Sequence, residues 1–176
     1  MGRIGSVLII GCGRALGGRP IQLLATSPGS GGAGPCLRIV GLPGGARGCG
    51  YAPSERGPPV TEAIGGEQTV HRGPQSPLEL YGETTAAVSS ITLSYRLPSG
   101  CIRHKRAALI RVRDRATLRA ARIREPFGYF VGGVPTHTSN VSAEARSKSG
   151  KVLERFSFDR LAGGRPSDRF ILTPKG

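Results

Sequence analysis

The chain of 176 residues has no tryptophan, one methionine (Met1) and one asparagine (Asn140), and only four of its 25 basic residues are lysines. A surface that is selected only for positive charge can use lysine as well as arginine. Arginine, glycine, proline and alanine share GC-rich codons, so nucleotide composition is one explanation for the whole residue mix. This explanation competes with every functional interpretation of the arginines.

Closely spaced metal ligands and paired catalytic groups are also missing. The cysteines form no C-x-x-C pair, and His71, His104 and His137 each stand alone. Zinc sites require neighbouring Cys or His ligands, and the eleven acidic residues are scattered. We therefore expect no enzymatic activity, no metal and no cofactor. Free thiols are expected, because disulfides would require export to an oxidising compartment; the cysteines are Cys12, Cys36, Cys49 and Cys101.

The N-terminal residues join an apolar run to glycines. Residues 7–10, followed by Gly11 and Gly13, have the pattern of a strand that opens into a phosphate-binding loop. A dinucleotide site also needs a helix after that loop and an acidic residue for the ribose. Pro20 leaves little room for the helix, and the first acidic residue is Glu55. The favoured interpretation is an apolar run that ends in a loop.

Targeting signals near the N-terminus are weak. Residues 1–6 fit the loose myristoylation pattern, and Cys12 offers a place for a second acyl chain. Residues 9–12 resemble a bacterial lipobox, and the first 54 residues contain five arginines and no acid, as in organellar transit peptides. No run approaches the roughly 18 apolar residues of a membrane-spanning helix. The compartment is therefore not predicted, and no transmembrane segment is expected.

Glycine and proline divide the chain near residue 78. Residues 11–77 contain 17 glycines and 9 prolines in 67 positions, whereas residues 101–176 contain 7 and 4 in 76 positions. Glycine increases backbone freedom, and proline removes a hydrogen-bond donor. The sequence therefore predicts a short apolar segment at 1–10, a mostly irregular stretch at 11–77, and a small α+β domain at 78–174.

Patterns that predict strands and helices lie mainly in the second half of the chain. Residues 87–97 alternate apolar and polar side chains and predict a strand with one wet face. The spacing favours a helix at 106–124, stopped by Pro126, although alternation at 108–113 leaves a strand as the alternative for its first third.

Three more elements are expected further along. They are a short strand at 128–131 that ends before two glycines, a helix at 151–162, and a last strand at 169–173. The predicted fold class is a largely irregular Gly/Pro-rich N-terminal half with a small α+β assembly, containing one basic helix, in the C-terminal half.

The densest positive charge lies in residues 102–125, where nine basic residues against two acidic ones leave a net charge of +7. Arginines bind phosphates with bidentate geometry and release counterions from nucleic acids. This segment has no aromatic residue for base stacking, so binding to RNA or DNA should depend little on sequence. The candidate nucleic-acid-binding residues are Arg103, Arg106, Arg111, Arg113, Arg115, Arg119, Arg122 and Arg124. The alternatives are a solvated helix face, and a basic helix on an anionic membrane or in the groove of an acidic partner.

Two functional hypotheses follow from these observations. The first is that the chain is the product of an orphan or overprinted reading frame without enzymatic activity, which accounts for the skewed composition and the missing motifs. The second is a small basic protein that binds nucleic acid non-specifically through the arginine-rich segment. No small-molecule site is predicted, and the sequence does not predict an oligomeric state.

Overall fold

The computed structural model describes residues 7–14, 18–26, 35–41, 47–49, 57–66, 78–135, 137–158 and 172–174. These residues form thirteen strands and one short helix, and the predicted α+β assembly with a long basic helix was wrong. The elements are β1 (Val7–Arg14), β2 (Pro20–Thr26), β3 (Cys36–Val40), β4 (Arg47–Cys49), β5 (Val60–Gly66), β6 (Leu78–Thr85), β7 (Ser90–Arg96), β8 (Ile102–Arg106), β9 (Ala108–Val112), α1 (Arg115–Ala120), β10 (Phe127–Val134), β11 (Ser139–Arg146), β12 (Val152–Phe158) and β13 (Leu172–Pro174).

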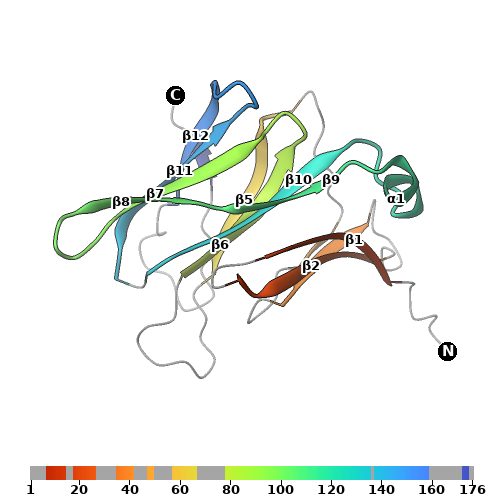
Figure 1. The fold of residues 1–176 in the computed structure, drawn as a ribbon, viewed down its shortest axis with the longest axis horizontal. Helices are drawn as coiled ribbons and strands as arrows, with labels where there is room; N and C mark the ends of the chain where they lie inside the picture. Colours follow the sequence, from red (N-terminus) through yellow and green to blue (C-terminus); the bar gives the residue numbers. More distant parts are fainter. Residues whose placement is uncertain are drawn as a thin grey trace.

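The strands form three antiparallel sheets (Figure 1). Sheet A has the order β1-β2-β3-β4, sheet B has β5-β6-β10-β9, and sheet C has β13-β12-β11-β7-β8. One buried cluster joins sheet A to sheet B, and a second joins sheet B to sheet C. The described part of the chain is therefore a three-layer β-structure with sheet B in the middle.

Strand β10 lies in the middle sheet, where both faces of a strand are covered by other sheets. All eight of its residues are buried. Side chains alternate between the two faces of a strand. Phe127 and Tyr129 belong to the cluster with sheet A, whereas Phe130 and Val134 belong to the cluster with sheet C. The strand predicted at 128–131 is present, but it continues through both glycines. A Cβ on Gly132 would lie 2.5 Å from Leu93 Cδ1, so the missing side chain allows sheet C to approach.

Most of sheet A, from Gly11 onward, lies in the stretch 11–77 that was predicted to be mostly irregular. Its inward side chains are aliphatic, and those of Ile21, Leu23 and Ile39 are almost completely buried. Strand β1 continues through Gly11 and Gly13 and pairs with β2, with a register shift between Ile9 and Gly11, so the strand does not open into a phosphate-binding loop at these glycines. A Cβ on Gly11 would lie 2.5 Å from Ile110 Cγ2 in sheet B. These glycines therefore permit close packing between two sheets.

The predicted helix at 106–124 was wrong, because this range contains the last residue of β8, the whole of β9 and the short helix α1. Strand β8 pairs with β7 at the edge of sheet C, and β9 pairs with β10 at the edge of sheet B. Ala107 lies between them and donates its backbone N–H to Ile91 O, which marks the point where the chain changes sheets. The alternative of a strand in the first third was the correct one. Only α1, which buries Leu118, is helical.

The remaining expectations had mixed outcomes. Strand β7 confirms the strand predicted at 87–97, with Ile91 and Leu93 buried. The helix predicted at 151–162 was wrong, because residues 152–158 form β12, which pairs along its length with β11. Phe156 and Phe158 on this strand pack against each other, with ring centroids 5.5 Å apart. The last predicted strand overlaps β13, although residues 169–171 lie outside the described residues.

The cysteines differ from one another. Cys12 and Cys101 are free and exposed, as expected. Cys36 is buried and disulfide-bonded, so the prediction of free thiols was wrong for this residue. The chain has four cysteines, and the one that remains is Cys49, which faces Cys36 in the backbone register of β3 and β4.

Candidate functional site

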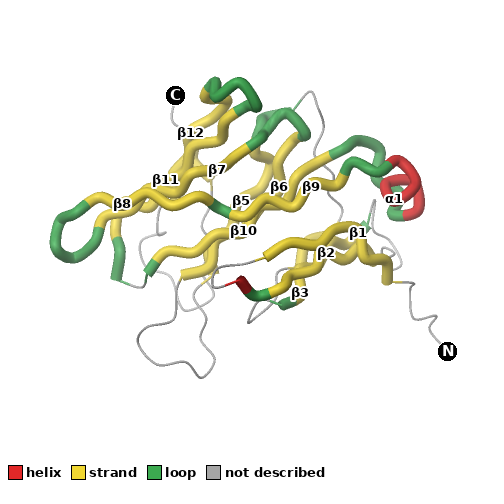
Figure 2. The backbone as a smooth tube through the Cα atoms, in the orientation of Figure 1, coloured by secondary structure: helices red, strands yellow, loops and turns green. Residues whose placement is uncertain are grey.

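The eight arginines predicted to bind nucleic acid lie along one continuous part of the chain. Strands β8 and β9 follow each other along the long axis of the molecule and lead to α1 (Figures 1 and 2). At about 3.3 Å per residue, the ten steps from Ile102 to Val112 span roughly 33 Å. We call the arginines on β8, on β9 and around α1 the arginine track; they are Arg103, Arg106, Arg111, Arg113, Arg115, Arg119, Arg122 and Arg124.

All eight side chains of the arginine track are exposed. In the described part of the chain, the two ion pairs join Glu144 to Arg146 and to Arg155, and none involves the track. Arg111 donates to Ser89 O at 2.6 Å, which holds this guanidinium between sheets B and C. The track therefore presents positive charges that form no ion pair with the carboxylates of the described residues.

The arginines do not form one helical stripe. Arg103 and Arg106 lie on the edge strand of sheet C, whereas five others surround α1 at the far end of β9. Helix α1 is fixed by Asp114, whose carboxylate accepts the Thr117 N–H at 2.7 Å. This backbone hydrogen bond lowers the pKa of Asp114, so the helix cap is charged at neutral pH.

A second polar region covers the outer face of sheet C. Strand register places Arg155, Glu144, Thr92 and Arg106 side by side across four strands, and we call them the charged row. The neighbouring row contains Ser142, Ser94 and His104, and we call it the hydroxyl row. Most of these side chains, together with Arg146, line a shallow groove of about 420 Å³.

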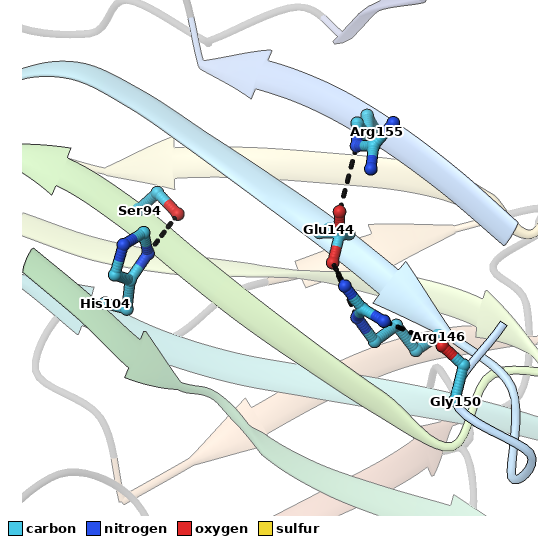
Figure 3. A network of polar contacts seen from close by, with 6 residues as sticks. All are labelled: Ser94, His104, Glu144, Arg146, Gly150 and Arg155. Carbon is cyan, nitrogen blue, oxygen red and sulfur yellow. Dashed lines mark hydrogen bonds and ion pairs between the residues drawn. The ribbon is translucent and has the colours of Figure 1, made fainter. Parts of the chain in front are cut away.

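Glu144 organises the charges in this groove (Figure 3). Its Oε1 accepts from Arg146 Nε at 2.6 Å, and its Oε2 accepts from Arg155 Nε at 2.9 Å. Burial acts to raise the pKa of Glu144, but the hydrogen bonds and charges of Arg155 and Arg146 outweigh it, and the pKa is lowered. Arg146 Nη1 also donates to Gly150 O at 2.7 Å, so this guanidinium is held at two ends.

The hydroxyl row contains one hydrogen bond, which joins Ser94 Oγ to His104 Nδ1 at 2.8 Å (Figure 3). In the described part of the chain, the hydroxyls of Ser142 and Thr92 have no hydrogen-bond partner. The groove thus offers hydroxyls that both donate and accept, one carboxylate, and two guanidiniums.

Sequence reasoning missed the groove. It identified the wet face of the strand at 87–97, which supplies Thr92 and Ser94, but it assigned Arg155 to a helix and gave no role to Glu144. The register that joins these residues depends on strand pairing, which local patterns do not encode. Strict alternation in residues 141–145 was the signal that could have identified β11.

Other kinds of site find little support. Within the described residues, no group of three His, Cys, Asp or Glu side chains is placed to hold a metal ion. Of the helices in that part of the chain, none is long and apolar enough to span a membrane. Comparison with protein-family models, with curated proteins and with solved structures found no match for the chain.

Proposed function

We propose that the protein is a non-enzymatic, basic β-protein that binds nucleic acid without sequence preference through the arginine track. The observation that carries this proposal is that one stretch of the chain carries eight exposed arginines with no ion-pair partner among the described residues. Phosphate contacts supply most of the affinity in non-specific binding, and arginine suits them because of its bidentate geometry. The roughly 33 Å of β8 and β9 is close to one turn of B-DNA, about 34–36 Å.

The same arginines also have a simpler use in the fold. Strands β8 and β9 lie at sheet edges, and charged side chains on an edge strand hinder pairing with other chains. That role accounts for charge on the two strands. It does not account for the five arginines around α1, which lie outside any strand.

The test compares two variants that lose the same charge. In the first, Arg113, Arg115, Arg119 and Arg124 are replaced by Gln, and in the control Arg14, Arg19, Arg38 and Lys148 are replaced by Gln; all eight side chains are exposed. Affinity for a fluorescent 20-base-pair DNA is measured across a range of salt concentrations. The track variant should bind more weakly, and its salt slope should fall by about 0.9 for each lost phosphate contact.

The control variant should keep a nearly unchanged slope. Equal losses in the two variants would mean that attraction follows only the net charge of +14, and the proposed site would be wrong. That result would favour the other hypothesis, the product of an orphan or overprinted reading frame. Its own test is the coding DNA, where a frame under selection should show more synonymous than amino-acid-changing differences between close strains.

A further inference from the structure

The groove on sheet C adjoins the arginine track. Arg106 belongs to the track and also ends the charged row, because it faces Thr92 in the register of β7 and β8. Neighbouring strands lie about 4.8 Å apart, so the charged row from Arg155 to Arg106 is roughly 14 Å long. A chain of phosphates that follows the track can therefore reach a second arginine, Arg155, on the far side of Thr92 and Glu144.

The groove has a chemistry that the track lacks. Guanidiniums only donate hydrogen bonds, whereas a ribose 2′-hydroxyl both donates and accepts. Thr92 and Ser142 have hydroxyls without partners in the described part of the chain, and Glu144 is held in place as an acceptor by two arginines. Arg155 and Arg106 flank these groups on either side. The arrangement alternates phosphate-binding and hydroxyl-binding groups, as a ribose-phosphate backbone does.

Aromatic stacking does not contribute. Phe156 lines the groove, but its ring is 1% exposed and packs inward against Phe130. The groove should therefore contact the sugar and phosphate groups of a nucleic acid, and its affinity should depend little on the identity of the bases.

We propose that the groove binds the ribose-phosphate backbone of single-stranded RNA and gives the protein a preference for RNA over DNA. This inference rests on the proposed nucleic-acid binding and specifies its substrate. The hydroxyls of Thr92 and Ser142 contact the 2′-hydroxyl, and Arg106 and Arg155 contact the flanking phosphates.

The experiment measures the affinity of the full chain for three fluorescent 12-mers of adenosine: RNA, DNA and 2′-O-methyl RNA, at one salt concentration. RNA should bind about fivefold more tightly than DNA, a ratio that corresponds to one net hydrogen bond. The 2′-O-methyl strand should bind as DNA does, because it has lost its donor. Thr92→Val combined with Ser142→Ala should lower RNA affinity to the DNA value and leave DNA affinity unchanged.

The matched control is Ser99→Ala combined with Ser139→Ala, which removes two exposed hydroxyls outside the groove and should keep the RNA preference. Equal binding of RNA and DNA by the unmodified chain would overturn the RNA inference while leaving nucleic-acid binding intact. An RNA preference that survives Thr92→Val and Ser142→Ala would overturn the assignment to the groove. Binding of neither polymer would overturn the proposed function, and the inference with it. The three-polymer comparison needs no variant, so it decides the preference even if the double variant fails to fold.

Discussion

The two faces of sheet B are packed by different means. Toward sheet C, the contacts are made by large rings, with Phe130 and Phe156 at a centroid distance of 6.3 Å. Toward sheet A, the rings of Phe127 and Tyr129 meet only aliphatic side chains of that sheet, and Gly11 and Gly13 let β1 lie directly against Ile110. Rings from both sheets meet at the interface with sheet C, whereas at the interface with sheet A only sheet B supplies rings. The same glycines that indicate an irregular chain in the sequence are what brings sheet A close to its neighbour.

The largest effect should come from deleting a ring between sheets. Phe127 and Phe130 lie on the same strand, are almost completely buried, and face opposite layers. Either substitution by alanine should cost about 3–5 kcal/mol, because it leaves a cavity. Amide hydrogen exchange should then speed up in β7, β11 and β12 for Phe130→Ala, and in β1 to β3 for Phe127→Ala. Identical exchange patterns would show that the two interfaces open together.

The disulfide of Cys36 should be next in size and should act on sheet A alone. Closing a loop of about 15 residues is worth roughly 3 kcal/mol, so Cys36→Ser should destabilise by about 2–4 kcal/mol. Thermal unfolding with and without a reductant measures this effect. Cys101→Ser is the control, because that thiol is free and exposed. A reductant that leaves the unfolding temperature unchanged would contradict the prediction.

Adding volume at the glycine interface should cost less. Gly11→Ala places a Cβ 2.5 Å from Ile110 Cγ2, so overpacking should destabilise by about 1–3 kcal/mol. Ile110→Ala removes the opposing atom, and the double variant should be more stable than the sum of the two single effects. Chemical denaturation of the four proteins gives the coupling energy. Gly150→Ala does not serve as a control, because Gly150 has a φ of 84°. Strictly additive effects would mean that β1 moves away to accommodate the methyl group.

The smallest effect should be a dependence of the free energy of unfolding on pH, which arises from Glu154 on β12. Glu154 Oε2 accepts the Val60 N–H at 2.7 Å, and burial raises the pKa of this carboxyl despite that hydrogen bond. A raised folded-state pKa stabilises the fold below the unfolded value, and this contribution is lost as the pH rises through the folded value.

Glu154→Gln keeps an acceptor for Val60 and removes the charge. The variant should therefore gain less than about 0.5 kcal/mol over the unmodified protein at pH 7, because Glu154 remains partly solvated. The gain should disappear near pH 4. Denaturant titrations at the two pH values measure it, and a gain that grows on acidification would reverse the assigned sign.

Secondary structure was predicted correctly from local sequence patterns where one short segment contains the whole pattern. Alternation around Ile91 and Leu93 is complete within β7, and that strand was predicted. The arginine-rich segment failed for a related reason, since its apolar residues fit two periods at once. Ile110 and Val112 alternate as a strand requires, while Leu118 lies in a helix of six residues. Sheet contacts with β10 decide in favour of the strand, and these contacts are invisible in the segment itself.

The sequence by itself determined the charge of the molecule, the wet and dry faces of β7, and the concentration of arginine between residues 102 and 125. Only the tertiary structure decided what each glycine does and which polar side chains meet. Thr92 and Arg155 are neighbours of Glu144 through the register of three strands, although 63 positions separate them in the chain. Strand pairing is non-local, and a shift of one residue would turn either side chain to the opposite face. For that reason the arginine track is visible in the sequence, and the groove beside it is not.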